Sequence, residues 1–342
     1  MRFLMSEGDQ QSATEEGQSL LHRLGHFGAT IGKKAPKKRS TRLIIQGGFA
    51  FLIFAFLVFT VASQWSELRE KGVEFTLLWI IPAMAAMAFY YILSAEVWGL
   101  ILKFMGSPVK AGEAQRIWAQ PLLVRYIPGS VLFVLARILL AEKVGVPRRV
   151  STVGIVYEQA VSIVAAMTVA TYFIITHPDL QDNPLRWLPL LVIPTIVVML
   201  HPAIFGRITS KALTMLGREP LPQLMPFGRV MVCFFAYIGL WAVMGVGVYC
   251  AGRSVHFLAW DQLPTVAASQ VIGFLAAVIS AVTPAGLGVR DTAFAWAVKT
   301  ALPSGSFGVD AVIAIAVRAV QTVVELIYVG AVTLISRRRG IP

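Results

Sequence analysis

Charged residues are scarce in this chain: they make up 14% of its 342 residues, while 56% are hydrophobic. Soluble domains usually carry about 25% charged residues. A soluble chain of this length could bury an ordinary core without so large an excess of apolar residues. The scarcity of charge therefore excludes an ordinary soluble domain and indicates an integral membrane protein.

Cysteine and histidine are also too few and too dispersed to build a metal or redox site. Cys233 and Cys250 lie in one apolar segment, too far apart along it to form a disulfide. The five histidines show no metal-ligand spacing. G-x-S-x-G, H-E-x-x-H and P-loop patterns are missing as well. We therefore expect no metal, no cofactor and no enzymatic activity.

What the chain does contain is a series of long apolar segments, and apolar runs of about 18 or more residues are typical of transmembrane helices. The run Leu43–Ser63 carries no charge and begins too far from the N-terminus to resemble a signal peptide. The predicted membrane segments are 43–63, 77–102, 118–141, 153–176, 187–205, 229–251, 264–301 and 309–335.

Two of these segments are unlike ordinary spans because Pro and Gly, which break helices, interrupt them. Residues 118–141 contain Pro128-Gly129, and residues 264–301 are too long for one span and contain Pro284 and Gly286. Broken backbone at membrane depth is tolerated only against protein or a water-filled cavity. We therefore expect each segment to form a re-entrant hairpin.

The distribution of basic residues supports this topology. With re-entrant hairpins, 21 Lys and Arg residues lie on the cytoplasmic side and 4 outside, whereas single crossings would give 16 and 9. The positive-inside rule favours the first arrangement, which has about six full spans and both termini in the cytoplasm. It also explains the net charge of +12 without any nucleic acid. The expected location is the cytoplasmic (inner) membrane.

The predicted topology contains an inverted repeat. Residues 77–176 and 229–335 each run as a span, a hairpin and a span, in opposite orientations. Inverted repeats with broken helices are typical of transporters. The expected fold is thus an all-α membrane domain over 43–335, between a basic tail, 1–42, that we expect to be mostly disordered and a short basic tail, 336–342.

The predicted topology places eight charged side chains near the bilayer centre, where each costs about 2.5–3.5 kcal/mol on insertion scales. Their near balance suggests ion pairs inside the bundle. We expect Arg318 to pair with Glu158 or Glu96, and Glu325 to pair with an arginine of a hairpin. Structural ion pairs that hold helices together are the alternative to a functional role. The eight are Arg125, Arg137, Arg290, Arg318, Glu96, Glu158, Asp291 and Glu325.

The breaks themselves predict a binding site. A helix N-terminus exposes free N–H groups and a partial positive charge, so it binds anions such as phosphate. An arginine beside each break would add bidentate contacts. The candidate substrate-binding residues are Arg125, Pro128, Gly129, Ser130, Arg137, Pro284, Gly286, Gly288, Arg290 and Asp291.

The motifs around these breaks resemble those of a known family. Arg125-Tyr126-Ile127-Pro128-Gly129, followed by Arg137 and Glu158, resembles the first motif of the flippase-like lysylphosphatidylglycerol synthase transmembrane family. Thr283-Pro284-Ala285-Gly286-Leu287-Gly288-Val289-Arg290-Asp291 resembles its second motif, with Asp in place of the more typical Glu. The resemblance covers roughly residues 43–335.

This resemblance implies a lipid-translocating membrane domain, in a stand-alone member whose chain ends before any soluble synthase domain. The expected function is translocation of an anionic phospholipid or a lipid-linked glycan carrier. The alternatives are a membrane-embedded transferase subunit, with Glu158 or Asp291 as base, and a non-transporting scaffold for a glycosyltransferase or synthase partner. Membrane lipids are the expected partners, and the oligomeric state stays open.

Overall fold

The computed structural model of the chain describes residues 76–126, 131–176, 180–215, 224–280, 289–302 and 308–340. Across these ranges the chain is helical and contains no strand. The predicted first span, 43–63, lies outside the described residues. So do Pro128, Gly129 and Ser130 in the first predicted hairpin, and Pro284, Gly286 and Gly288 in the second.

Five helical stretches in the described ranges are long and apolar enough to cross a membrane. They are Leu77–Phe104 (α4), Arg148–Thr176 (α7), Phe227–Arg253 (α10), Trp260–Ile279 (the 3₁₀ turn η4, Trp260–Gln262, with most of α11, Leu263–Ser280) and Val309–Arg338 (α13). The sequence predicted four of them as membrane helices, and the structure confirms that each is a helix long and apolar enough to span. Only 22% of the most apolar window of α4 is buried inside the protein, so most of its apolar surface faces outward, as lipid contact requires.

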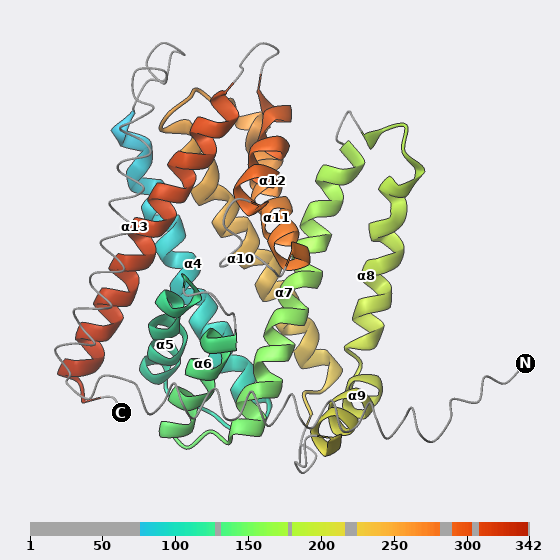
Figure 1. Ribbon diagram of the computed structural model, residues 1–342, viewed down its shortest axis with the longest axis vertical. Coiled ribbons are helices and arrows are strands. Elements are labelled where there is room, and N and C mark those ends of the chain that lie inside the picture. Colours follow the sequence, from blue (N-terminus) through green and yellow to red (C-terminus); the bar gives the residue numbers. More distant parts are fainter. Residues whose placement is uncertain are drawn as a thin grey trace, which may run out of the picture. The chain divides into compact units, whose positions relative to one another are not determined.

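The shorter elements lie around these long helices (Figure 1). In chain order they are Ala111–Ala119 (α5), Gln120–Tyr126 (η1), Val131–Lys143 (α6), Pro184–Trp187 (η3), Leu188–Met199 (α8), Pro202–Met215 (α9), Val289–Val298 (α12) and Lys299–Ala301 (η6). In Figure 1, α5 and α6 occupy one half of the bundle's length and α12 the other half.

The predicted span over 187–205 is not one continuous helix, because the chain forms two helices there. α8 ends at Met199 and α9 begins at Pro202. Pro202 is the first residue of α9, a position where proline is tolerated because its missing N–H would have no partner within the helix. With 12 residues, α8 is about 18 Å long and follows directly on η3, so the crossing of the membrane by this part of the chain stays a prediction.

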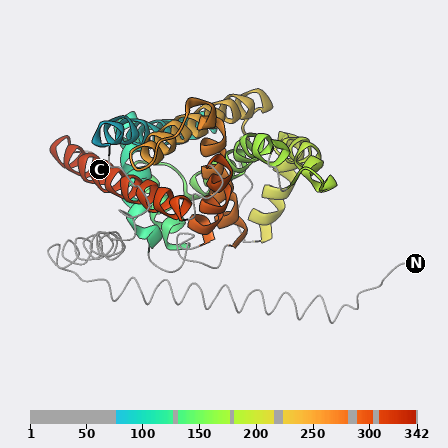
Figure 2. The same ribbon diagram turned by 90° about the horizontal axis from the view of Figure 1, so that it is seen from above.

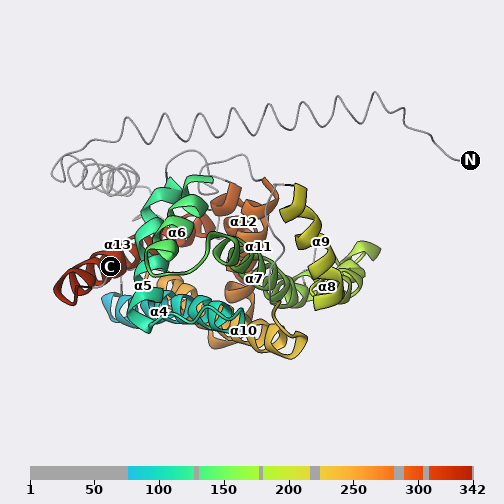
Figure 3. The same cartoon turned by 90° about the horizontal axis from the view of Figure 1, so that it is seen from below.

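The helix packing centres on α10, which packs most extensively against α4 and also against α7 and α11. The views along the bundle show α8 and α9 beyond α7 at one edge and α13 near the opposite edge (Figures 2 and 3). Small residues allow the close contacts. A Cβ added to Gly245 of α10 would lie 2.5 Å from the Cβ of Ala267 in α11. Such contacts are typical of helix interfaces in membranes, where packing rather than hydrophobic burial drives association.

Both predicted hairpin segments contain two helical pieces on either side of the predicted break. In the first, η1 and α6 pack against each other; in the second, α11 and α12 pack along each other. Gly273 of α11 marks that second contact, because a Cβ there would lie 2.9 Å from the carbonyl oxygen of Arg290. The residues between the pieces, 127–130 and 281–288, lie outside the described residues. The re-entrant path and the inverted repeat stay predictions, since α11 is itself long enough to span.

Candidate functional site

A buried ion pair joins α6 to α7. Nη1 of Arg137 lies 2.6 Å from Oε2 of Glu158, and the two residues are 1% and 3% exposed. The other carboxylate oxygen of Glu158 accepts a hydrogen bond of 3.0 Å from the indole Nε1 of Trp118 in α5. A low dielectric strengthens such a pair but makes each charge costly without its partner. The two contacts therefore hold α5, α6 and α7 together.

The guanidinium of Arg137 is only partly used by this pair. Its carbon Cζ lies 4.8 Å from the ring centroid of Trp98 and 5.8 Å from that of Phe133, within cation–π range. Its Nε and Nη2 atoms are buried and have no hydrogen-bond partner within the described ranges. A buried donor without an acceptor costs about 1–3 kcal/mol. Arg137 therefore has hydrogen-bonding capacity to spare for an anionic ligand.

A second polar chain crosses from α12 to α13 and α4. Nη2 of Arg290 donates to Oε1 of Gln321 at 2.7 Å. Nε2 of Gln321 then donates to the hydroxyl of Tyr91 at 3.4 Å, and that hydroxyl donates to Oε2 of Glu325, also at 3.4 Å. Tyr91, Gln321 and Glu325 lie near the middle of their candidate spans and are buried. The chain thus connects the start of α12 to the interior of the bundle.

Aromatic rings link the Arg137–Glu158 ion pair to the polar chain that begins at Arg290. Tyr91 stacks on Tyr328 at 5.6 Å between ring centroids, and Trp118, which binds Glu158, lies 5.9 Å from Tyr91 and 6.2 Å from Tyr328. We call this assembly the polar cluster. Its members described so far are Trp98, Trp118, Arg137, Glu158, Tyr91, Arg290, Gln321, Glu325 and Tyr328.

Two further polar residues extend the polar cluster toward α5 and α4. The hydroxyl of Tyr328 donates to Oε1 of Gln115 at 2.6 Å, and Nε2 of Gln115 donates to Oε1 of Glu96 at 2.8 Å. The same nitrogen also reaches the carbonyl of Ile92 at 2.9 Å. Side chains from α4, α5, α6, α7, α12 and α13 therefore meet in one network, which draws on both predicted repeats.

The structure brings together much of the predicted charge set. Glu96, Glu158, Glu325, Arg137 and Arg290 all belong to the polar cluster. Arg318 is half-buried in α13, and Asp291 follows Arg290 in the first turn of α12. Arg125 lies in η1, and its side chain is outside what the structure describes.

The pairings differ from those predicted in one respect. We expected Arg318 to contact Glu158 or Glu96, but Glu158 binds Arg137 and Trp118, and Glu96 binds Gln115. Arg137 is nearer because α6 packs directly against α7. Whether Glu325 binds a hairpin arginine stays a prediction.

Sequence reasoning missed the uncharged members of the cluster. Tyr91, Gln115, Trp118 and Tyr328 carry no charge, so a search for ionisable residues in apolar segments passes over them. Gln115 lies between the predicted segments 77–102 and 118–141, so a search within those segments could not find it. Among the described residues, no group of three or more His, Cys, Asp or Glu could hold a metal ion.

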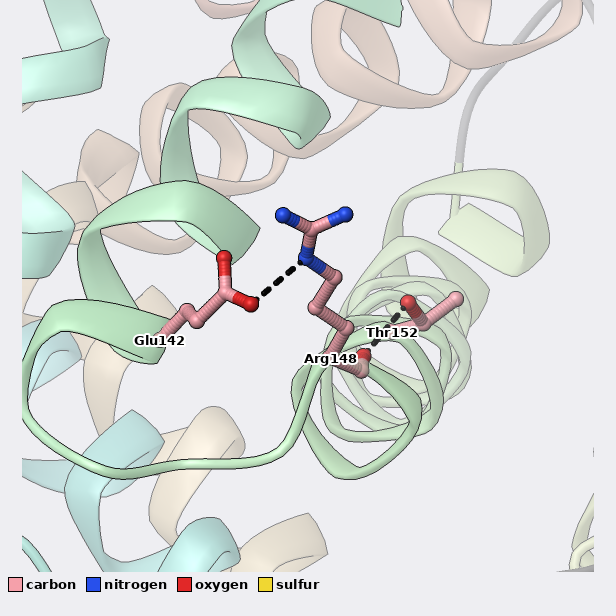
Figure 4. Close-up of polar contacts among 3 residues, drawn as sticks. All are labelled: Glu142, Arg148 and Thr152. Carbon is pink, nitrogen blue, oxygen red and sulfur yellow. Dashed lines mark hydrogen bonds and ion pairs between the residues drawn. The ribbon is translucent and has the colours of Figure 1, made fainter.

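An exposed ion pair provides a useful contrast (Figure 4). Nε of Arg148 at the start of α7 lies 2.8 Å from Oε1 of Glu142, and the two side chains are 52% and 45% exposed. Exposed pairs contribute only about 0–1 kcal/mol because water and salt screen them. This pair therefore serves as a control for the buried one.

Comparison with known proteins leaves the family open: no protein-family model matches the chain, and no curated protein matches its sequence.

Proposed function

We propose that this protein is a membrane lipid translocase that moves an anionic phospholipid or a lipid-linked glycan carrier across the cytoplasmic membrane. The polar cluster is the observation that carries the proposal. Charged and polar side chains from six helices meet at the depth of the candidate spans. Ionisable residues inside a membrane are costly, and they commonly mark substrate pathways.

The proposed architecture pairs two re-entrant hairpins within an inverted repeat. In support, η1 packs on α6 and α11 packs along α12, each pair on either side of a Pro/Gly-containing segment. The first pair and α12 lie in opposite halves of the bundle (Figure 1). Broken helices that approach each other from opposite sides are typical of transporters with inverted repeats.

The head group is held by the arginines at these breaks. Arg290 lies in the first turn of α12, where free backbone N–H groups and the helix dipole also attract an anion. Nε and Nη2 of Arg137 are two buried donors without a partner among the described residues. Arg125 precedes the other break and completes the phosphate site in this proposal. Glu158 and Glu325 balance the arginines when no lipid is bound, which lowers the cost of the empty site.

The test is lipid movement in reconstituted vesicles. Vesicles containing fluorescent phosphatidylglycerol are prepared with the parent protein, Arg137→Gln or Arg290→Gln, and a membrane-impermeant quencher reports the fraction of lipid that changes leaflet. Arg148→Gln is the matched control, because Arg148 is exposed and far from the predicted breaks in sequence. We expect the first two variants to slow movement at least tenfold and the control to match the parent. A parent protein that moves no lipid faster than empty vesicles would overturn the proposal in favour of a scaffold.

A further inference from the structure

A second arginine site lies at the end of α10, apart from the polar cluster. Arg253 is the last residue of α10, and four aromatic rings surround its guanidinium. The distances from Cζ to the ring centroids are 4.4 Å for Trp79, 4.9 Å for Trp260, 5.2 Å for Phe257 and 5.9 Å for Tyr249. We call these five residues the arginine–aromatic site. Its rings come from α4, from α10, from the connection after α10 and from η4.

Hydrogen bonds and ring contacts fix the guanidinium in place. Nη1 of Arg253 donates to the hydroxyl of Tyr249 at 2.9 Å, and that hydroxyl donates to the carbonyl of Leu258, also at 2.9 Å. Trp260 contacts Trp79 edge to face at 5.8 Å between centroids and lies 5.5 Å from Tyr249. The side chain is therefore held in one orientation before any ligand arrives, which reduces the entropy lost on binding.

The charge of Arg253 has no acidic partner among the residues that the structure describes. Its contacts there are one hydroxyl and four ring faces, so several of its five N–H donors are uncommitted. His256 adds no second cation, because burial lowers its pKa and keeps the imidazole neutral at pH 7. Arg253 is therefore a fixed positive charge at this site, and the exposed Asp261 follows Trp260 in η4.

The position of the site points to lipid. Arg253 ends a candidate span, Trp260 begins another, and Trp79 lies in the first turn of a third. Tryptophan and tyrosine gather at this level in membrane proteins, where the head groups lie. Phe257 and Trp260 remain 74% and 63% exposed, so their rings are available to acyl chains and glycerol.

Aromatic residues that only anchor the protein at the membrane surface would need no cation among them. A cation that only contacts head groups would need no surrounding rings. We propose that the arginine–aromatic site binds the phosphodiester of an anionic lipid in the leaflet that faces this end of the bundle. The planar guanidinium fork matches two phosphate oxygens, and the exposed rings cover the apolar part of the same molecule. This inference requires only that the protein lies in a membrane, and it does not rest on the proposed translocase function.

The experiment counts phosphatidylglycerol and phosphatidylcholine molecules that stay bound when the protein is released from detergent micelles into a native mass spectrometer. The variants are Arg253→Gln, Arg253→Lys and Phe257→Ala. Arg186→Gln is the matched control, because Arg186 also lies over a tryptophan, Trp187 at 5.0 Å, but over no other ring of the described residues. Each protein is first checked for monodispersity.

We expect Arg253→Gln to lose one phosphatidylglycerol at subsaturating lipid, with at least a fivefold drop in that bound species. Arg253→Lys should fall between parent and Gln, because it keeps the charge but loses the fork. Phosphatidylcholine binding should not change, and Arg186→Gln should bind as the parent does. Unchanged phosphatidylglycerol binding by Arg253→Gln, or an equal loss of both lipids, would overturn the proposal. If Arg253→Gln does not fold, Arg253→Lys and Phe257→Ala decide, since unaltered phosphatidylglycerol binding by both would equally overturn it.

Discussion

Arg137 and Glu158 form an ion pair at 2.6 Å while being 1% and 3% exposed, so the polar contact between α6 and α7 is shielded from solvent. Such a pair adds little net stability, because the desolvation of both charges offsets their attraction. Its larger consequence is specificity: neither charge tolerates the loss of the other. α6 follows the first predicted break, and its position against α7 therefore depends on Glu158.

The first prediction follows from this pair. Glu158→Gln should destabilise the protein by about 3–5 kcal/mol, because it leaves a buried guanidinium without a counter-charge. The midpoint of thermal unfolding in detergent measures the effect. The double variant Arg137→Met with Glu158→Gln should recover part of the loss. Glu142→Gln, which breaks the exposed pair with Arg148, should leave the midpoint nearly unchanged. Equal effects of Glu158→Gln and Glu142→Gln would show that burial does not govern the pair.

The second prediction concerns helix packing. Gly245→Ala should destabilise the contact between α10 and α11 by about 1–3 kcal/mol, because the new Cβ would lie 2.5 Å from the Cβ of Ala267 and 3.2 Å from its Cα. Gly239→Ala in the same helix is the control, since nothing lies within 4 Å of its added Cβ. That variant should be neutral or slightly stabilising, since Ala favours helix over Gly. Detergent unfolding curves of the two variants provide the comparison, and a drop for Gly239→Ala alone would contradict it.

The third prediction separates geometry from charge at the second break. Arg290→Lys keeps the positive charge but loses the planar fork that donates to Gln321 at 2.7 Å. We expect it to lower the affinity for anionic lipid about tenfold, and Arg290→Gln to lower it further, in proteins that remain monodisperse. Arg125→Lys and Arg125→Gln should behave in the same way if Arg125 belongs to the same phosphate site. Binding is measured with phosphatidylglycerol in micelles, and four well-folded variants that bind like the parent would remove both arginines from the site.

The fourth prediction addresses topology. The native cysteines, Cys233 and Cys250, are buried and free, so replacing them with alanine provides a background for labelling. Three exposed residues are replaced by cysteine one at a time: Lys143 before α7, Lys211 after α8, and Asp261. Asp261 lies at the end of the bundle that we expect to face outward. An impermeant maleimide added to intact cells should label Asp261→Cys alone, and the other two only after the membrane is opened. Labelling of Lys143→Cys from outside would exclude the re-entrant path of the first hairpin and the inverted repeat.

The sequence by itself determined the class of fold and most of the long helices. The bilayer acts on each segment separately, so length and apolar composition are enough to predict α4, α7, α10 and α13. The same local reasoning predicted helix interruptions in 118–141 and 264–301, because Pro and Gly act on the backbone beside them. It did not predict that the helix over 187–205 is interrupted between α8 and α9.

Only the tertiary structure decided which side chains meet. A charged residue in an apolar segment indicates that it needs a partner. The sequence offered several residues of opposite charge for each such residue. The packing of α6 on α7 gave Glu158 to Arg137 and not to Arg318, and the contacts of α4 with α13 placed Tyr91 between Gln321 and Glu325. Such pairings depend on how helices cross and turn against one another, which is a property of the whole bundle and not of any one segment.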